Sequence, residues 1–202
     1  MSGAGDGAGG ATLPGWAEVL DFWFDAAHAP LWFKKDEAFD RAIRARFAPL
    51  VTAAVDGGLA TWEDAAPSCL ALLIVLDQFP RNAWRGTPRA YCGDARALAV
   101  ARRALARGFD RAVPIGQRRF FYLPLEHSED LADQEESCAL FRRLAAEAAP
   151  ADRASAEEQL LYAERHREII ARFGRFPHRN AILGRASTPA EVAFLAEPMS
   201  SF

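Results

Sequence analysis

The chain has 202 residues, of which 50% are apolar, 11% aromatic and 25% charged, and its formal net charge is −3. This composition excludes a largely disordered protein, and the slight acidity argues against nucleic acid or an anionic membrane surface as the main partner. The longest apolar run, residues 69–76, is far shorter than the roughly 20 residues that a membrane span requires.

Local composition predicts the boundary between an N-terminal tail and the folded domain. Residues 1–15 are rich in glycine and alanine and lack the basic start and apolar stretch of a secretory signal. We therefore expect residues 1–15 to form a flexible tail and residues 16–202 to form a single all-helical domain. The three scattered cysteines contain no CxxC pair, which favours a reducing cytoplasm over a disulfide framework or a thiolate zinc site.

Apolar side chains recur at a helical period through most of the chain. A first short helix is expected over residues 16–23. A second is expected to run from about Lys35 to Gly57, with a kink or an early end at Pro49. A third should open with a capping box at residues 61–64 and place its apolar run at the centre of the fold.

The later helices are predicted from their caps. Asp94 is the expected N-cap of a fourth helix that ends at Gly108, and a short helical turn is expected near residues 115–121. Pro124 is the expected first residue of a long sixth helix that Pro150 stops. Capping boxes at residues 155–158 and 188–191 should open two more, and the first of these should end at Gly174. The pattern predicts about eight helices, arranged as a bundle or as stacked helical hairpins.

One short pattern occurs twice. Phe-Pro-Arg-Asn at residues 79–82 is echoed by Phe-Pro-His-Arg-Asn at residues 176–180, and each is expected just after a helix that stops at proline. Arginine and asparagine at such places can simply cap the helix end. The alternative is that these arginines converge as forks for a carboxylate or phosphate, with the asparagines as neutral donors: Arg81, Arg85, Arg175 and Arg179, with Asn82 and Asn180.

A second polar motif, Glu-His-Ser-Glu at residues 126–129, falls in the first turn of the expected sixth helix. The helix dipole there stabilises carboxylates and lowers the proton affinity of His127, which could then act as a base or hydrogen-bond hub. Asp130 and Gln134 would extend the same helix face. A pocket and a buried polar network are equally compatible with this motif.

The remaining candidates each have a simpler interpretation. Asp77, expected to end the third helix, could be a general base, but a salt bridge to Arg81 or Arg175 is the simpler interpretation. His166 lies on an apolar helix face typical of a core histidine, whereas His178 lies on the second arginine–asparagine loop and is a better ligand contact. A metal site built from the histidines and Asp77 is a weaker hypothesis, because no HExxH motif or paired cysteines are present.

Three of these motifs also carry a family resemblance. Residues 76–82, residues 122–129 with Gln134, and residues 172–180 with Gly184 and Arg185 resemble a bacterial family catalogued as domain of unknown function 924. The resemblance implies an all-α, tetratricopeptide-like arrangement of antiparallel helix pairs. It implies no activity, cofactor or catalytic residue.

Together these features predict one polar pocket that binds a small anion or an anionic metabolite, with no cofactor and no metal. His127 is the candidate catalytic residue for proton transfer, if the ligand reacts. The expected ligand-binding residues are Asp77, Arg81, Asn82, Glu129, Gln134, His166, Arg175, His178, Arg179 and Asn180. The alternative is a helical adaptor for a protein or peptide partner, and a metal-dependent hydrolase is a third interpretation.

Overall fold

The computed structural model describes residues 13–201, and the regular elements in that part of the chain are all helical. The α-helices are α1 (Trp16–Trp23), α2 (Glu37–Val55), α3 (Ala66–Leu73), α4 (Phe79–Ala83), α5 (Asp94–Ala106), α6 (Arg119–Glu126), α7 (Leu131–Glu147), α8 (Arg153–Phe173) and α9 (Pro189–Leu195). The all-α prediction is confirmed. Tetratricopeptide-like stacking stays a prediction, and most of the expected tail lies outside the described residues.

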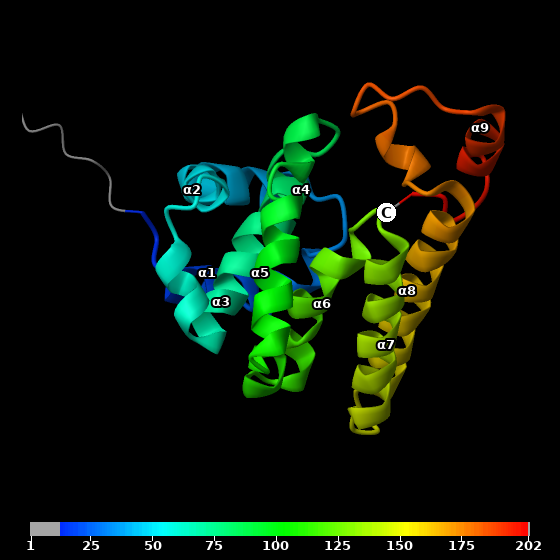
Figure 1. Ribbon diagram of the computed structural model, residues 1–202. Helices are drawn as coiled ribbons and strands as arrows, with labels where there is room; N and C mark the ends of the chain where they lie inside the picture. Colours follow the sequence, from blue (N-terminus) through cyan, green and yellow to red (C-terminus); the bar gives the residue numbers. More distant parts are fainter. Residues whose placement is uncertain (1–12, 202) are drawn as a thin grey trace, which may run out of the picture.

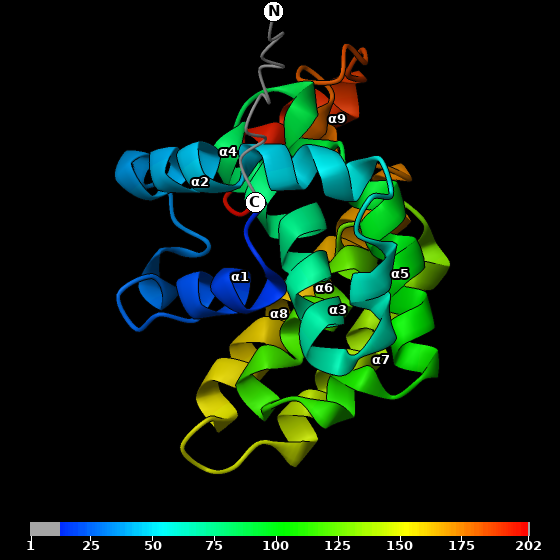
Figure 2. The ribbon, with the colours of Figure 1, turned by 90° about the vertical axis from the view of Figure 1, so that its left-hand side faces the viewer.

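Helices α1 to α6 gather around α3, whereas α7 and α8 form a long hairpin beside them, and α9 lies beyond the end of α8 (Figures 1 and 2). Residues 69–76 are at most 1% exposed, as expected for the centre of the fold. The C-terminal part has a smaller apolar core of its own, formed by Ile169, Ile170, Phe176 and Phe194. Polar side chains gather where these two parts meet, at the end of α6.

Helices α3 and α4 are joined by a π-helical turn, Ile74–Gln78, so residues 66–83 form one continuous helical run. Pro80 accounts for the wide turn, because its ring lacks an N–H and would crowd the carbonyl four residues earlier in a regular α-helix. The expectation that the third helix stops before Arg81 is therefore wrong. Asp77 lies inside the helical run, and Arg81 and Asn82 lie on its last turn.

The expected long sixth helix is two helices. Pro124 lies inside α6, which ends at Glu126, and α7 begins only after Asp130, whose carboxylate accepts the Ala132 N–H at 2.8 Å. The hydroxyl of Ser128 accepts the Asp130 N–H at 3.2 Å, and such side-chain bonds compete with helical ones and stop the helix. His127 therefore follows the last turn of α6, where the dipole favours its proton instead of opposing it.

Several other helix starts also differ from expectation. Residues 61–64 belong to a 3₁₀ turn and form no capping box, Asp94 is the first helical residue after Gly93, and α8 begins before the expected box at residues 155–158. Pro49 lies within α2 without ending it. The capping box at Thr188 is confirmed, as is the end of α8 at Gly174, which adopts the left-handed conformation (φ 67°).

Candidate functional site

An ion-pair chain runs from the π-helical turn to the start of α5. The Asp77 side chain is fully buried, and its Oδ1 lies 2.9 Å from Nη1 of Arg81. Arg81 also donates two hydrogen bonds, of 2.9 and 3.0 Å, to the two carboxylate oxygens of Asp94. Of the two arginines predicted to pair with Asp77, Arg81 is the partner, and its guanidinium group is shared between two carboxylates.

Asp94 reaches Arg81 because α5 begins directly against the π-helical turn. Gly93 permits this approach, since a Cβ at that position would overlap the carbonyl oxygen of Leu76. The glycine therefore fixes how close the first carboxylate of α5 comes to the guanidinium group.

His127 forms the next link in the cluster. Its Nδ1 lies 2.7 Å from Oδ1 of Asp77, and because a carboxylate only accepts, Nδ1 is the donor. Burial and the charge of Arg81 lower the pKa of His127, although Asp77 opposes that effect. Burial opposes ionisation of Asp77, but Arg81 and His127 hold its pKa below the ordinary value. The pair is thus a carboxylate with a neutral imidazole, whose Nε2 can accept a proton.

A second carboxyl–imidazole pair lies beside the first. Oε1 of Glu126 is 3.3 Å from Nδ1 of His166, which also lies 2.8 Å from the carbonyl of Tyr162. Burial and the nearby charge of Asp77 raise the pKa of Glu126 to about 8, so this group is a carboxylic acid at neutral pH. Burial lowers the pKa of His166. The rings of His127 and His166 have centroids 6.3 Å apart, so the two pairs are neighbours.

Arg179, in the 3₁₀ turn Pro177–Arg179, brings a second guanidinium group to Asp94. Its side chain is 8% exposed, and its central carbon lies 4.8 Å from the ring centre of Tyr91 and 4.4 Å from that of Phe176. Nη1 is 3.5 Å from Oδ2 of Asp94, and the buried Nε has no hydrogen-bond partner in the part of the chain that the structure describes. Burial and the charge of Arg81 lower the pKa of Arg179 to about 10.

His178 lies on the same turn as Arg179. Its ring centroid is 5.6 Å from that of Phe176, the ring that also packs against Arg179. Burial and the adjacent charge of Arg179 lower the pKa of His178 to about 4. The predicted residues that the fold brings together are therefore Asp77, Arg81, His127, His166, His178 and Arg179.

Glu129 forms hydrogen bonds that hold the segment carrying Arg179 in place. It accepts hydrogen bonds of 2.6 and 2.9 Å from Arg185 and one of 2.8 Å from the backbone N–H of Phe176. Asn180 accepts from Nε of Arg185 and donates to Ser187, each at 3.0 Å. Arg185 was not predicted, and its place in the second motif is the signal that could have indicated it.

Three other predicted residues bond away from the cluster. Arg175 donates to Glu191 at 2.6 and 2.8 Å, and Asn82 donates to Asp40 at 3.0 Å. Gln134 is fully buried and donates to the carbonyl of Glu126 at 2.6 Å, which holds the end of α6 in place. Arg85, the fourth expected fork, also bonds to Asp40.

The sequence prediction missed four members of the cluster: Tyr91, Asp94, Glu126 and Phe176. Asp94 was assigned only a capping role, and the neighbouring Gly93 was the available sign of a close approach. Glu126 was attributed to the helix dipole, because nothing local shows that its carboxyl group is buried.

Comparison with known proteins places the chain in a family. The family model described as bacterial protein of unknown function (DUF924) matches residues 19–199. The chain belongs to the DUF924 family. A solved structure of a protein of unknown function from Agrobacterium tumefaciens is 44% identical, with a TM-score of 0.80, and the match covers 90% of this chain and 96% of that one. No curated protein matches the chain.

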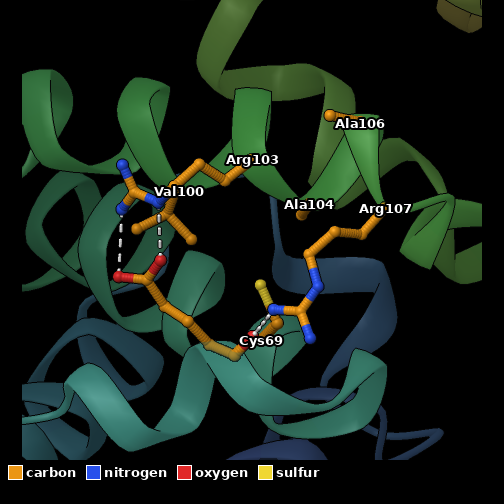
Figure 3. Close-up of a pocket in the computed structure, with 7 residues that line it drawn as sticks. Cys69, Val100, Arg103, Ala104, Ala106 and Arg107 are labelled. Carbon is orange, nitrogen blue, oxygen red and sulfur yellow. Dashed lines mark hydrogen bonds and ion pairs between the residues drawn. The ribbon is translucent and has the colours of Figure 1, made fainter.

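Two cavities of this DUF924 protein lie away from the histidine–arginine cluster. One, of about 300 Å³, lies between the turn at Glu63 and α5, with Cys69 between Arg103 and Arg107 (Figure 3). Burial raises the pKa of the Cys69 thiol to about 12, so the thiol stays neutral. The other cavity, of about 570 Å³, lies between the end of α8 and the start of α9.

Residues 13–201 contain neither a grouped set of metal ligands nor a helix suited to span a membrane. In that part of this DUF924 protein, no group of three or more histidine, cysteine, aspartate or glutamate side chains has the arrangement of a metal site. Within the same residues, no helix combines the length and apolarity needed to cross a bilayer.

Proposed function

We propose that the cluster around Arg179 binds a small anion or an anionic metabolite. The observation that carries this proposal is the incomplete pairing of Arg179. Its side chain is almost fully buried, its single ion pair is 3.5 Å long, and its Nε has no acceptor among residues 13–201. A buried cation in this state is costly unless a further acceptor joins it, and an anionic ligand would provide one.

The neighbouring groups suit such a ligand. Tyr91 and Phe176 provide apolar walls beside the guanidinium group, and burial keeps the imidazoles of His166 and His178 neutral. The single N–H of neutral His166 is on Nδ1, which donates to the carbonyl of Tyr162, so this ring adds no charge beside the guanidinium group. The ligand would therefore meet one charged guanidinium fork between apolar rings within a largely buried site.

His127 is the group that would move a proton if the bound anion reacts. Its Nδ1 is fixed by Asp77 at 2.7 Å, an arrangement that orients the ring and leaves Nε2 as the base. The side chain of His127 is 14% exposed, so it can reach both solvent and a ligand.

The adaptor alternative is less favoured, because exposed apolar side chains such as Leu161 and Val192 lie on different helices.

The test is thermal unfolding of the full chain in acetate, phosphate and sulfate, each compared with sodium chloride at equal ionic strength. A ligand at about 100 times its dissociation constant stabilises by roughly 2.7 kcal/mol, a shift of about 5–11 °C for a chain of this size. We expect at least one anion to stabilise the wild type and to lose its effect in Arg179→Ala.

Arg89→Ala is the matched control, because Arg89 also lies over an aromatic ring, that of Trp84 at 3.9 Å, but is exposed and outside the cluster. It should keep the full response. If no anion stabilises the wild type beyond chloride, or if Arg179→Ala keeps the response, the proposed function is wrong.

A further inference from the structure

Building on the proposed function, we infer that the ligand held by Arg179 is a small monocarboxylate and not a phosphate or sulfate. The reasons are the charge balance of the cluster, the free edge of the guanidinium group and the rings beside it.

The charge balance of the cluster favours a monoanion over a dianion. Arg81 and Arg179 carry two positive charges, and Asp77 and Asp94 carry two negative ones within 3.5 Å of those arginines. Glu126 adds no charge at neutral pH, because burial raises its pKa to about 8. A dianion would leave this buried cluster two charges negative, whereas a monoanion leaves it one charge negative, which is the smaller electrostatic penalty.

Neither Arg185 nor Arg81 can offset the second negative charge of a dianion. Arg185 is committed to Glu129 through two hydrogen bonds, of 2.6 and 2.9 Å. Arg81 is likewise committed to Asp77 and Asp94. Of these three arginines, Arg179 alone donates no guanidinium hydrogen bond to any acceptor within residues 13–201, so the ligand meets a single guanidinium fork.

The geometry of that fork favours a planar group. The guanidinium carbon lies 4.8 and 4.4 Å from the ring centres of Tyr91 and Phe176, so these two rings limit the directions from which further partners can approach. Nη1 is directed to Asp94, which leaves the edge formed by Nε and Nη2. A carboxylate is planar and can accept two parallel hydrogen bonds from one such edge.

The experiment compares sodium acetate with inorganic phosphate and sulfate by isothermal titration calorimetry, at equal ionic strength and with the folded full chain. Wild-type protein should bind acetate more tightly than either tetrahedral anion. Arg179→Lys keeps the charge but lacks the fork, so it should bind acetate at least about tenfold more weakly. Arg89→Lys should bind acetate as the wild type does.

A second measurement does not depend on the stability of any variant. In an NMR spectrum of the wild type, the Nε–H resonance of Arg179 should shift on addition of acetate, and the Nε–H resonance of Arg89 should not. If phosphate or sulfate binds more tightly than acetate, or Arg179→Lys binds acetate unchanged, the carboxylate assignment is wrong and the proposed anion site stands. If none of the three anions binds, both fail.

Discussion

The two Phe-Pro segments contain similar residues and use them differently. Residues 79–82 continue a buried helix, and their arginine is held by Asp77 and by both oxygens of Asp94. Residues 176–180 follow the end of α8 and form a 3₁₀ turn, and Arg179 reaches only one oxygen of Asp94, at 3.5 Å. The arginine of the first segment is therefore paired with two carboxylates, whereas the arginine of the second is paired with one, over a longer distance.

The two similar Phe-Pro segments nevertheless come together in the structure. Arg81 and Arg179 both pair with Asp94 and both lie over the ring of Tyr91. The asparagines diverge instead: Asn82 bonds to Asp40, and Asn180 bonds to Ser187. The number of carboxylates within reach therefore decides whether an arginine anchors the fold or is available to a ligand.

The largest effect expected from this difference is that of Arg81→Ala. This substitution leaves the fully buried carboxylate of Asp77 without its main cation, and breaking a buried ion pair costs about 3–5 kcal/mol. We expect a loss of that size in the free energy of unfolding, measured by urea denaturation at pH 7. The pKa of Asp77 should rise toward its ordinary value, so Asp77 should become protonated at a higher pH in the variant than in the wild type.

Arg179→Ala is the comparison for that experiment. It removes a buried charge whose one ion pair among the described residues is 3.5 Å long, so we expect unfolding free energy within about 1 kcal/mol of the wild type. A loss as large as that of Arg81→Ala would mean that Arg179 is a structural anchor. The contrast between the two segments would then disappear.

The next largest effect is expected from Gly93→Ala, which separates the two segments from their shared carboxylate. The new methyl group would overlap the carbonyl oxygen of Leu76, so α5 must move away from the π-helical turn. Such overpacking costs about 1–3 kcal/mol in unfolding free energy, measured by urea denaturation. Gly116→Ala is the control, since nothing lies within 4 Å of its added carbon, and its stability should match the wild type. Equal stability of the two variants would contradict the close approach.

The sequence predicts well what local chemistry decides. The all-α class, the capping box at Thr188 and the stop at Gly174 depend on residues a few positions apart, as does the pairing of Asp77 with Arg81. The position of Pro124 inside α6 was missed, because a proline is favoured at the first position of a helix and disfavoured in its interior.

The cluster itself is harder to predict because its members come from distant parts of the chain. The pairs of Arg179 with Asp94 and of His166 with Glu126 depend on how the α7–α8 hairpin packs against α6. The proton on Glu126 depends on burial, which no local pattern reveals. These residues are recognised only once the helices are placed.

The smallest expected effect tests that buried proton. Burial raises the pKa of Glu126 to about 8, whereas in the unfolded chain it is near its ordinary value of 4.5, so between these values the folded protein holds a proton that the unfolded chain releases. Stability must therefore fall as pH rises through this window. The histidines have lowered pKa values, so their contribution rises with pH and is complete only about one pH unit above their ordinary value of 6.5. Between pH 6.5 and 8 the wild type should lose about 1–2 kcal/mol through Glu126.

Glu126→Gln removes the titrating group while keeping its shape, so its unfolding free energy should not fall between pH 6.5 and 8 and should rise slightly as the unfolded histidines lose their protons. Urea denaturation at several pH values in that range measures both proteins. Glu135→Gln, at an exposed position on α7, should keep the wild-type slope. Parallel losses in the wild type and Glu126→Gln would show that Glu126 is ionised in the folded protein. The cluster around Arg179 would then carry one more negative charge, and a neutral or cationic ligand would suit it better than a carboxylate.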